Sequence, residues 1–293
     1  MRVSYMIDDI DVSVVIPVYN AERFIRTAIS SVLSQEYVNI EVIIIDDGST
    51  DSSGKIIQSI NDDRIKYFKK ENGGIVSALN FAIPKVHANI IARMDADDIM
   101  EPLRLRKQLD YMARYNLDVV GGNIKLIDEN DRIIGRKKFP TNHFDIISSL
   151  PFINPLCHPA TMIRTAVLKK ANGYSLGTDG AEDFDLWCRL SRVCTFGSVP
   201  EDLLSYRLTS NSISQTLHLH RISLCTNSIR KNIPNAPIVF YSFSLYLSKS
   251  LAVLIYAAKY AYITKFKSFY YMISGFIRAL NFSFKIHKGK NEC

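Results

Sequence analysis

The stretch Ala88-Asn89-Ile90-Ile91-Ala92-Arg93-Met94-Asp95-Ala96-Asp97-Asp98 places an acidic cluster directly after an apolar run. The apolar part predicts a buried strand over residues 89–94. Three carboxylates within four positions repel one another, so they need water, basic partners or a hard divalent cation such as Mg²⁺ or Mn²⁺. A plain acidic turn at a strand end has the same pattern, so the surrounding sequence has to separate the two interpretations.

Strand and helix patterns alternate, with short connections, on both sides of this stretch. The predicted strands cover residues 12–16, 40–45, 65–68, 89–94 and 118–124, and the predicted helices cover 24–33, 51–60, 74–83 and 102–115. This alternation is typical of an α/β fold with a parallel sheet and helices on both faces. Asn20 is expected to cap the first helix.

The pattern changes after Leu126. Residues 127–133 predict a hairpin, residues 160–164 a further strand, and residues 181–190 a helix. An irregular stretch over residues 151–159 contains Asn154 and His158. For His158 we expect a structural or polar role rather than metal ligation.

Polar motifs follow the predicted strands, at the edge where open α/β sheets bind their ligands. Asp46-Asp47-Gly48-Ser49 is either an Asx-type turn or a site where one carboxylate accepts the imide N–H of a pyrimidine. Tyr19 would supply an aromatic wall for that base. Asn72-Gly73-Gly74 is either a turn or a helix start whose amides, including that of Gly74, suit a diphosphate. No GxGxxG or GxxxxGK[ST] motif supports a dinucleotide or P-loop site.

A second pair of carboxylates, Glu182-Asp183, opens the predicted helix over residues 181–190. Acidic residues in a first helical turn often serve only the helix dipole. Alternatively, one of the two is a general base that takes the proton of an attacking sugar hydroxyl.

Charge is distributed unevenly along the 293 residues. Up to Asp202 there are 24 Lys and Arg against 28 Asp and Glu, whereas the remaining 91 residues carry 12 basic side chains and one acid, Glu292. Such a basic segment fits an anionic membrane surface or nucleic acid, and no nucleic-acid motif accompanies it. The five cysteines form no CxxC pair, which predicts reduced thiols in the cytosol, and the first residues contain no apolar signal segment.

The C-terminal region is rich in Tyr, Phe and Leu, with 17 uncharged residues between Lys231 and Lys249. Two prolines interrupt this run early, and lysines recur in the residues after it, so a true membrane span is not favoured. A basic helical segment at the membrane interface fits better, and a helical extension packed on the domain is the alternative.

Together these motifs resemble the family 2 glycosyltransferases, whose nucleotide-sugar fold is called GT-A. The matching text runs over about residues 11–210: VSVVIPVYNAERFIRTAISSVLSQ (12–35), EVIIIDDGSTD (41–51), ENGGIVSALN (71–80), ARMDADDIMEPLRLRKQ (92–108), HPATMIR (158–164) and AEDFDLWCRL (181–190). The resemblance implies a GT-A, Rossmann-like open sheet with helices on both faces and a C-terminal helical extension. We therefore expect a catalytic domain over residues 1–210 and a basic region over 211–293, for which membrane association is the favoured role.

The resemblance also assigns roles to individual residues. Asp97 would hold the divalent metal, Mn²⁺ or Mg²⁺, and Asp183 would be the general base. The nucleotide-sugar-binding positions implied or suggested by these motifs are Pro17, Tyr19, Asp47, Gly74 and Asp95. The chemistry of the family is inverting transfer from a nucleotide sugar, usually UDP-linked. No QxxRW motif of the processive synthases is present, which favours addition of one sugar per encounter.

The sequence thus predicts an inverting hexosyltransferase that uses a UDP-sugar and a saccharide acceptor, lipid-linked through undecaprenyl diphosphate. Such an enzyme would act in O-antigen, capsule or exopolysaccharide synthesis, at the cytoplasmic face of the inner membrane, without a nucleic-acid partner. A non-catalytic sugar-nucleotide-binding protein and an aspartate-based phosphotransferase are the alternatives. A phosphotransferase motif would stand near the start of its domain with Thr or Val after the second Asp, whereas Asp98 stands here.

Overall fold

The computed structural model describes residues 10–151, 153–209 and 218–233, in which nine strands form one sheet. The strand order is β3-β2-β1-β4-β8-β6-β9-β5, and β7 pairs with β6. The strands are β1 (Val12–Val18), β2 (Ile40–Asp46), β3 (Ile65–Lys69), β4 (Ile90–Arg93), β5 (Ile99–Met100), β6 (Val119–Ile127), β7 (Ile133–Lys137), β8 (Met162–Arg164) and β9 (Phe196–Arg207).

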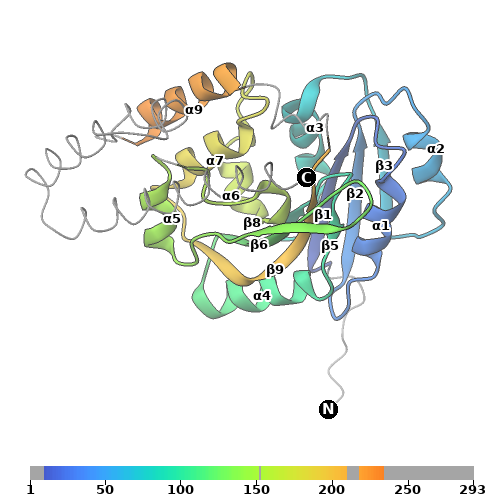
Figure 1. Cartoon of the computed structure of the whole chain (residues 1–293), viewed down its shortest axis with the longest axis horizontal. Helices are drawn as coiled ribbons and strands as arrows, with labels where there is room; N and C mark the ends of the chain where they lie inside the picture. The colour runs from blue at the N-terminus through green and yellow to red at the C-terminus, as the bar shows by residue number, and fades with distance from the viewer. Residues whose placement is uncertain (1–9, 152, 210–217, 234–293) are drawn as a thin grey trace, which may run out of the picture.

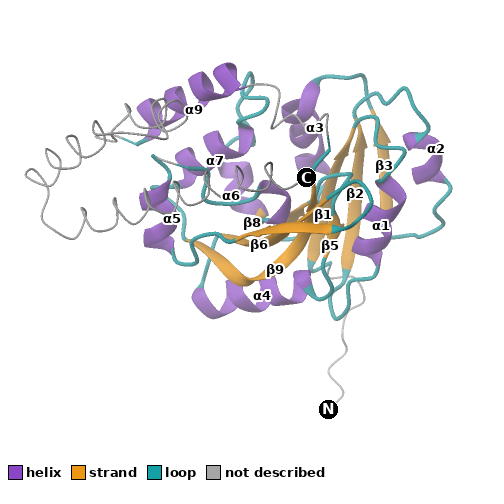
Figure 2. Ribbon diagram, in the orientation of Figure 1, coloured by secondary structure: helices purple, strands orange, loops and turns teal. Residues whose placement is uncertain are grey.

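The helices lie on both sides of this sheet (Figures 1 and 2). They are α1 (Ile25–Leu33), α2 (Ser53–Gln58), α3 (Gly74–Ala82), α4 (Arg104–Tyr115), α5 (His143–Ser149), α6 (Thr165–Lys170), α7 (Glu182–Leu190) and α9 (His218–Asn232), with 3-10 turns η1 (Ile83–Lys85) and η2 (His158–Ala160). Every strand and helix predicted up to residue 190 is present, and most of their ends shift by only one to three residues.

One part of the predicted arrangement is wrong. Strands β1 to β4 are parallel to one another, as expected, but β8 lies between β4 and β6 and is antiparallel to both. The sheet is therefore mixed rather than parallel. A strand as short as β8 has no periodicity that reveals its partners, and only the pairing of Ile163 with both Ile91 and Val119 places it.

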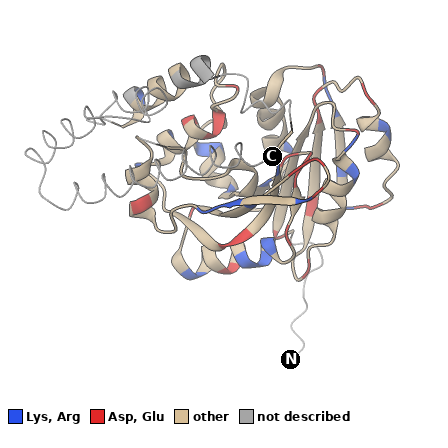
Figure 3. Cartoon of the chain, in the orientation of Figure 1, with Lys and Arg blue, Asp and Glu red and all other residues tan. Residues whose placement is uncertain are grey.

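Successive side chains of the central strands face opposite sides of the sheet, so each side has its own core. Val14 of β1 packs with α1, α2 and α4, whereas Val15 packs on the side of α3, α5, α6, α7 and α9. The predicted coverage of both faces by helices is confirmed. Acidic and basic residues are interspersed over these elements, and α4 carries both signs (Figure 3).

The described beginning of the C-terminal region packs against α7. Cys225 and Ile229 of α9 are buried on the α7 side, and Ser228 Oγ donates to Asp185 Oδ1 of α7 at 2.7 Å. No helix among the described residues is long and apolar enough to cross a membrane. The run after Lys231, on which membrane association was predicted, falls almost entirely outside the described residues.

Candidate functional site

Most of the predicted site residues follow β1, β2 and β4, which are parallel and run toward the same edge of the sheet, whereas Asp183 comes from α7. Figure 2 shows β1 and β2 side by side. Tyr19 follows β1 and is 54% exposed, so its ring is free to face a ligand. Pro17 lies inside β1, opposite Ile45 of β2. Pairing of β1 with β4 stops at Val15, so Pro17 lies where β1 has only one neighbour, and its missing N–H is tolerated.

The structure separates the two aspartates after β2. Asp46 is fully buried, and its carboxylate accepts the Ser49 amide at 2.7 Å and the Tyr67 hydroxyl at 2.6 Å. It therefore forms the turn that the sequence offered as the simpler explanation. Asp47 instead accepts the Lys70 ammonium at 2.5 Å and stands at the edge of the site. The cation of Lys70 beside Asp47 is a contact that sequence reasoning missed.

Three amides near the start of α3 already have partners within the protein. Those of Gly73 and Gly74 donate to the Asp47 carboxylate at 2.8–3.2 Å, and that of Val76 donates to Asp179 at 3.2 Å. Gly74 has φ +85°, and a Cβ there would lie 2.6 Å from Asp179 Oδ1. These contacts give Gly74 a role in fixing Asp47 rather than the direct contact with a diphosphate that we expected.

The acidic cluster after β4 has the composition of a divalent-metal site. One carboxylate oxygen from each of Asp95, Asp97 and Asp98 lies within 4.8 Å of the others. Burial raises the pKa of Asp97 to about 6, and the Asp95 charge adds to this effect. Burial, together with the charges of Asp95 and Asp97, raises the pKa of Asp98 well above its usual value. Its Oδ2 has no hydrogen-bond partner among the described residues. Hard oxygen ligands with uncompensated charge suit Mn²⁺ or Mg²⁺.

Arg207 at the end of β9 holds this acidic loop in place. Its backbone N–H donates to Asp98 Oδ1 at 2.8 Å, and its Nε donates to the carbonyl of Asp97 at 2.7 Å. Nη1 donates to the carbonyl of Asp128 at 2.8 Å, which ties the loop to the β6–β7 hairpin. No motif marks Arg207, because only the pairing of β9 with β5 and β6 brings it there.

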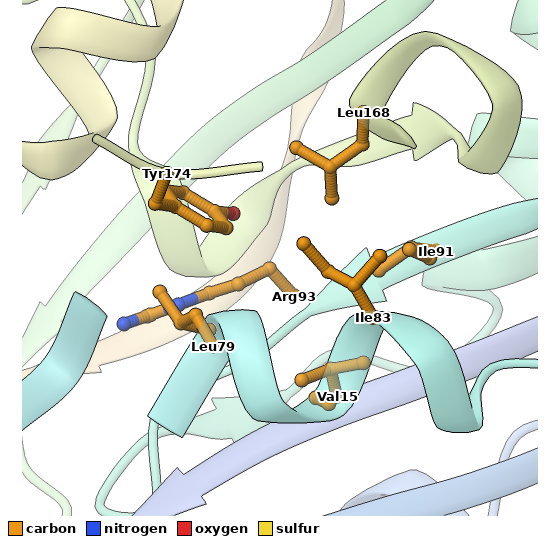
Figure 4. Close-up of a pocket in the computed structure, with 8 residues that line it drawn as sticks. Val15, Leu79, Ile83, Ile91, Arg93, Leu168 and Tyr174 are labelled. Carbon is orange, nitrogen blue, oxygen red and sulfur yellow. The ribbon is translucent and has the colours of Figure 1, made fainter. Parts of the chain in front are cut away.

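Arg93 connects the acidic cluster to the N-terminus of α7. Its guanidinium is buried, lies 2.5 Å from Asp95 Oδ1, and acts electrostatically on Glu182 and Tyr174. Arg93, Tyr174 and Leu79 line a cavity of about 10 Å³. Figure 4 shows the three side chains around it. That volume holds about one water, so this is a packing gap and not a donor pocket.

Replacing Arg93 with methionine is expected to destabilise the fold by about 3 kcal/mol, because Asp95 and Glu182 lose their buried cation. The midpoint of urea unfolding measures this. The control is Arg23→Met, which removes an exposed pair with Glu129 and should cost less than about 1 kcal/mol. Equal effects of the two substitutions would contradict a special role for Arg93.

The two carboxylates of α7 also have different surroundings. Glu182 accepts the Gly180 amide at 2.8 Å and lies 3.6 Å from His158 Nδ1, and burial raises its pKa. Asp183 accepts the Phe184 amide at 2.7 Å through Oδ1 and the Asn154 side-chain amide at 2.6 Å through Oδ2. Asn154 is thus a further site residue to which the sequence gave no role.

His158 lies between the two acidic groups. Its Nε2 is 2.9 Å from the Tyr174 hydroxyl, and burial, together with the Arg93 cation, lowers its pKa to about 3. It is therefore a neutral side chain of the protein interior, in agreement with the structural role we expected. Its Nδ1 lies 3.6 Å from Glu182, and Thr161, three residues further on, accepts the Arg93 amide at 3.0 Å, so this segment lies between the end of β4 and the start of α7.

Comparison with known proteins agrees with this geometry. The family model described as glycosyl transferase family 2 matches residues 13–171. The O-antigen biosynthesis glycosyltransferase WbnJ of Escherichia coli is 35% identical over 243 residues, which are 80% of this chain and 94% of that protein. An uncharacterised glycosyltransferase of Haemophilus influenzae is 34% identical over 236 residues, which are 76% of this chain and 73% of that protein.

Solved structures share the fold. Residues 1–349 of S. aureus TarS, in complex with UDP-GlcNAc, align with a TM-score of 0.65 at 18% identity, covering 92% of this chain and 81% of that one. The mannosyltransferase PcManGT of Pyrobaculum calidifontis, in complex with GDP-Man and Mn²⁺, aligns with a TM-score of 0.60 at 17% identity, covering 92% and 86%. The fold is thus that of known sugar transferases.

Proposed function

This chain belongs to glycosyl transferase family 2, and on that premise we propose that it transfers a hexose or N-acetylhexosamine from a UDP-sugar to a saccharide acceptor. The observation that carries the proposal is that β4 lies beside the segment over residues 158–161: Arg93, which pairs with Asp95 at 2.5 Å, donates its amide to Thr161, while His158 lies 3.6 Å from Glu182. Through these contacts an acidic, metal-type cluster and the carboxylate-rich start of α7 lie on either side of one segment. A donor diphosphate and an incoming hydroxyl need these two kinds of group on opposite sides of the transferred sugar.

We assign binding of the nucleotide base of the donor to Tyr19, Pro17 and Asp47. The exposed ring of Tyr19 offers a stacking surface, and the Asp47 carboxylate is an acceptor for an imide N–H. The Lys70 ammonium beside it can donate to a neighbouring carbonyl of the same base. TarS, which shares the fold, has been solved with UDP, so the fold accommodates a uridine diphosphate, and the choice of uridine rests on the imide N–H that Asp47 would accept.

Asp97 and Asp95 would hold the divalent cation, Mn²⁺ or Mg²⁺, which when bound would neutralise charge on the departing diphosphate as a Lewis acid. Arg207 keeps the carbonyl of Asp97 and the carboxylate of Asp98 in fixed positions. Arg93 balances part of the charge of Asp95, which lowers the repulsion among the three carboxylates.

On the acceptor side, we assign the general base to Asp183. Its two oxygens each accept one hydrogen bond from the protein, which leaves further lone pairs to take the proton of the attacking hydroxyl. A single displacement opposite the leaving diphosphate inverts the anomeric carbon, so an α-linked donor would give a β-linked product. Glu182 instead accepts the Gly180 amide and lies 3.6 Å from His158 Nδ1, so we do not assign it this role.

For the acceptor, we propose a saccharide on an undecaprenyl-diphosphate type lipid, in O-antigen, capsule or exopolysaccharide synthesis. Similarity to WbnJ supports the first of these settings. The enzyme would then work at the cytoplasmic face of the inner membrane, and the basic region over residues 211–293 would contact anionic lipid. Co-sedimentation with phosphatidylglycerol vesicles that falls with rising salt is the expected result, whereas no binding at low salt would contradict it.

The deciding experiment is a screen for UDP release across UDP-sugars, with Mn²⁺ or with chelator, using a synthetic lipid-diphosphate saccharide as acceptor. We expect release that requires both a particular donor and the metal, and that rises when acceptor is added. Release that is the same with and without chelator would contradict the metal site. A protein that binds UDP but releases none from any UDP-sugar would contradict the proposed donor class.

A further inference from the structure

Among the described residues, Asn154 is the one whose side chain donates a hydrogen bond to Asp183, the proposed general base. Its Nδ2 donates to Asp183 Oδ2 at 2.6 Å. An ionised carboxylate only accepts hydrogen bonds, so this contact fixes the orientation of the Asn154 amide, with Nδ2 toward Asp183. The other oxygen of Asp183 is held by the backbone N–H of Phe184, within its own helix. Asn154 is therefore the link that sets the rotation of the carboxylate about its last bond.

The backbone around Asn154 is well suited to hold that position. Asn154 precedes Pro155, which restricts it to extended conformations. The amide of Ile153 donates to the carbonyl of Ser149 at 2.9 Å, and the side chain of Leu156 is buried on the α7 side of the sheet. The segment is thus fixed on both sides of Asn154.

One atom of Asn154 lowers the stability of the folded state. Its Oδ1 is buried and has no hydrogen-bond partner. A buried acceptor without a partner destabilises the folded state, and a leucine of similar shape would avoid the loss. Such unsatisfied groups in native structures call for a reason beyond stability. The reason available here is the donation from Nδ2 of the same amide to Asp183.

We propose that Asn154 is a positioning residue for sugar transfer: it holds the Asp183 carboxylate so that a lone pair faces the attacking hydroxyl. The inference rests on the proposed function and deepens it by adding a residue that acts through the base. It predicts an effect on turnover rather than on donor binding. Asn154 hydrogen-bonds to Asp183, and it has no hydrogen bond to the residues that we assign to the nucleotide base of the donor or to the metal.

The test is Asn154→Leu, with kinetics under the donor and acceptor that the UDP-release screen identifies. We expect kcat to fall about 30- to 100-fold, since a misplacement of about 1 Å at a reacting group costs about 100-fold. The Kd for UDP, measured by calorimetry, should not change, and Tm should stay the same or rise because the unpaired Oδ1 is removed. Asn154→Asp keeps the shape but lacks the N–H donor, so it should lose at least as much turnover.

The matched control is Asn142→Leu. Asn142 caps α5, and both of its amide atoms are paired with Asp145 at 2.9 Å. This control should lower Tm and leave kcat unchanged, the opposite pattern to Asn154→Leu. If Asn154→Leu lowers Tm and weakens UDP binding along with kcat, the role is structural and the inference is wrong.

The two levels of the proposal fail in different ways. Wild-type kcat in Asn154→Leu, with turnover lost in Asp183→Asn, would overturn the positioning role and leave the proposed function intact. A wild-type protein that transfers no sugar from any donor would overturn the proposed function, and the inference with it.

Discussion

Substituting asparagine for Asp183 is expected to lower kcat by about 10³-fold, because a general base typically contributes about 10²- to 10⁴-fold to the rate. The asparagine side chain fills the same space but has no charge to take up the hydroxyl proton. Donor binding should persist, since Asp183 belongs to α7, whereas Tyr19 and Asp47 follow β1 and β2. The measurements are steady-state kcat and the Kd for UDP.

The control for this substitution lies two residues further along α7. Asp185→Asn makes the same chemical change in the same helical turn. Burial of Asp185 would raise its pKa, but hydrogen bonds from Ser175 and Ser228 and the Arg189 ion pair lower it on balance. This control should therefore reduce stability and not kcat. Normal turnover of Asp183→Asn would refute the assignment of the base.

Replacing Asp97 with asparagine is expected to abolish the metal-dependent part of UDP release and at the same time to stabilise the metal-free protein. In the wild type, the pKa of the Asp97 carboxyl is higher in the folded state than in the unfolded chain, so Asp97 loses its proton at lower pH when the chain is unfolded. Above about pH 6 the folded protein keeps a buried, repelled charge that the amide lacks. Thermal unfolding at pH 7 without metal measures this, and Tm should be higher than in wild type.

The same reasoning predicts the response of the wild type to pH and to metal. Below about pH 6 a proton occupies Asp97 and competes with the cation, so the affinity for Mn²⁺ should fall with decreasing pH. At pH 7 Mn²⁺ should raise the Tm of wild type and leave that of Asp97→Asn unchanged. A thermal shift with Mn²⁺ that is equal in the two proteins would show that the metal binds elsewhere.

A group that is expected to bind a cation thus lowers stability when the cation is absent. The same holds for Asn154, whose unpaired Oδ1 is a cost within the fold. In both places the local structure departs from what stability alone favours, which is common where a site has to be preorganised.

Local patterns in the sequence predicted most of the fold that positions these groups. Apolar runs and helical spacings gave the strands and helices up to residue 190, because each pattern reflects burial of one or both faces of its own element. The hairpin at residues 127–133 followed from a polar tetrapeptide between apolar residues. The cap expected from Asn20 is wrong, since Asn20 has φ +51° and accepts the Thr50 amide at 2.9 Å.

The sequence did not predict the contacts of acidic residues that are adjacent in the chain. Asp46 and Asp47 are neighbours, as are Glu182 and Asp183. All four are buried, and nothing in their order says which partner each carboxylate takes up. Tyr67, on the neighbouring strand β3, takes up Asp46, and Asn154 from a distant loop takes up Asp183. In each pair the partner is more than 20 positions away, so the choice depends on contacts that local spacing does not contain.

The sequence by itself determined the alternation of elements, the edge of the sheet where the acidic residues gather, and the family. The tertiary structure alone decided that β8 inserts beside β4, that Arg207 braces the acidic loop, and that Arg93 faces both that loop and α7. The reason is physical: periodicity records which face of an element is buried, whereas the partner of a buried charge is set by chain segments that meet only after folding.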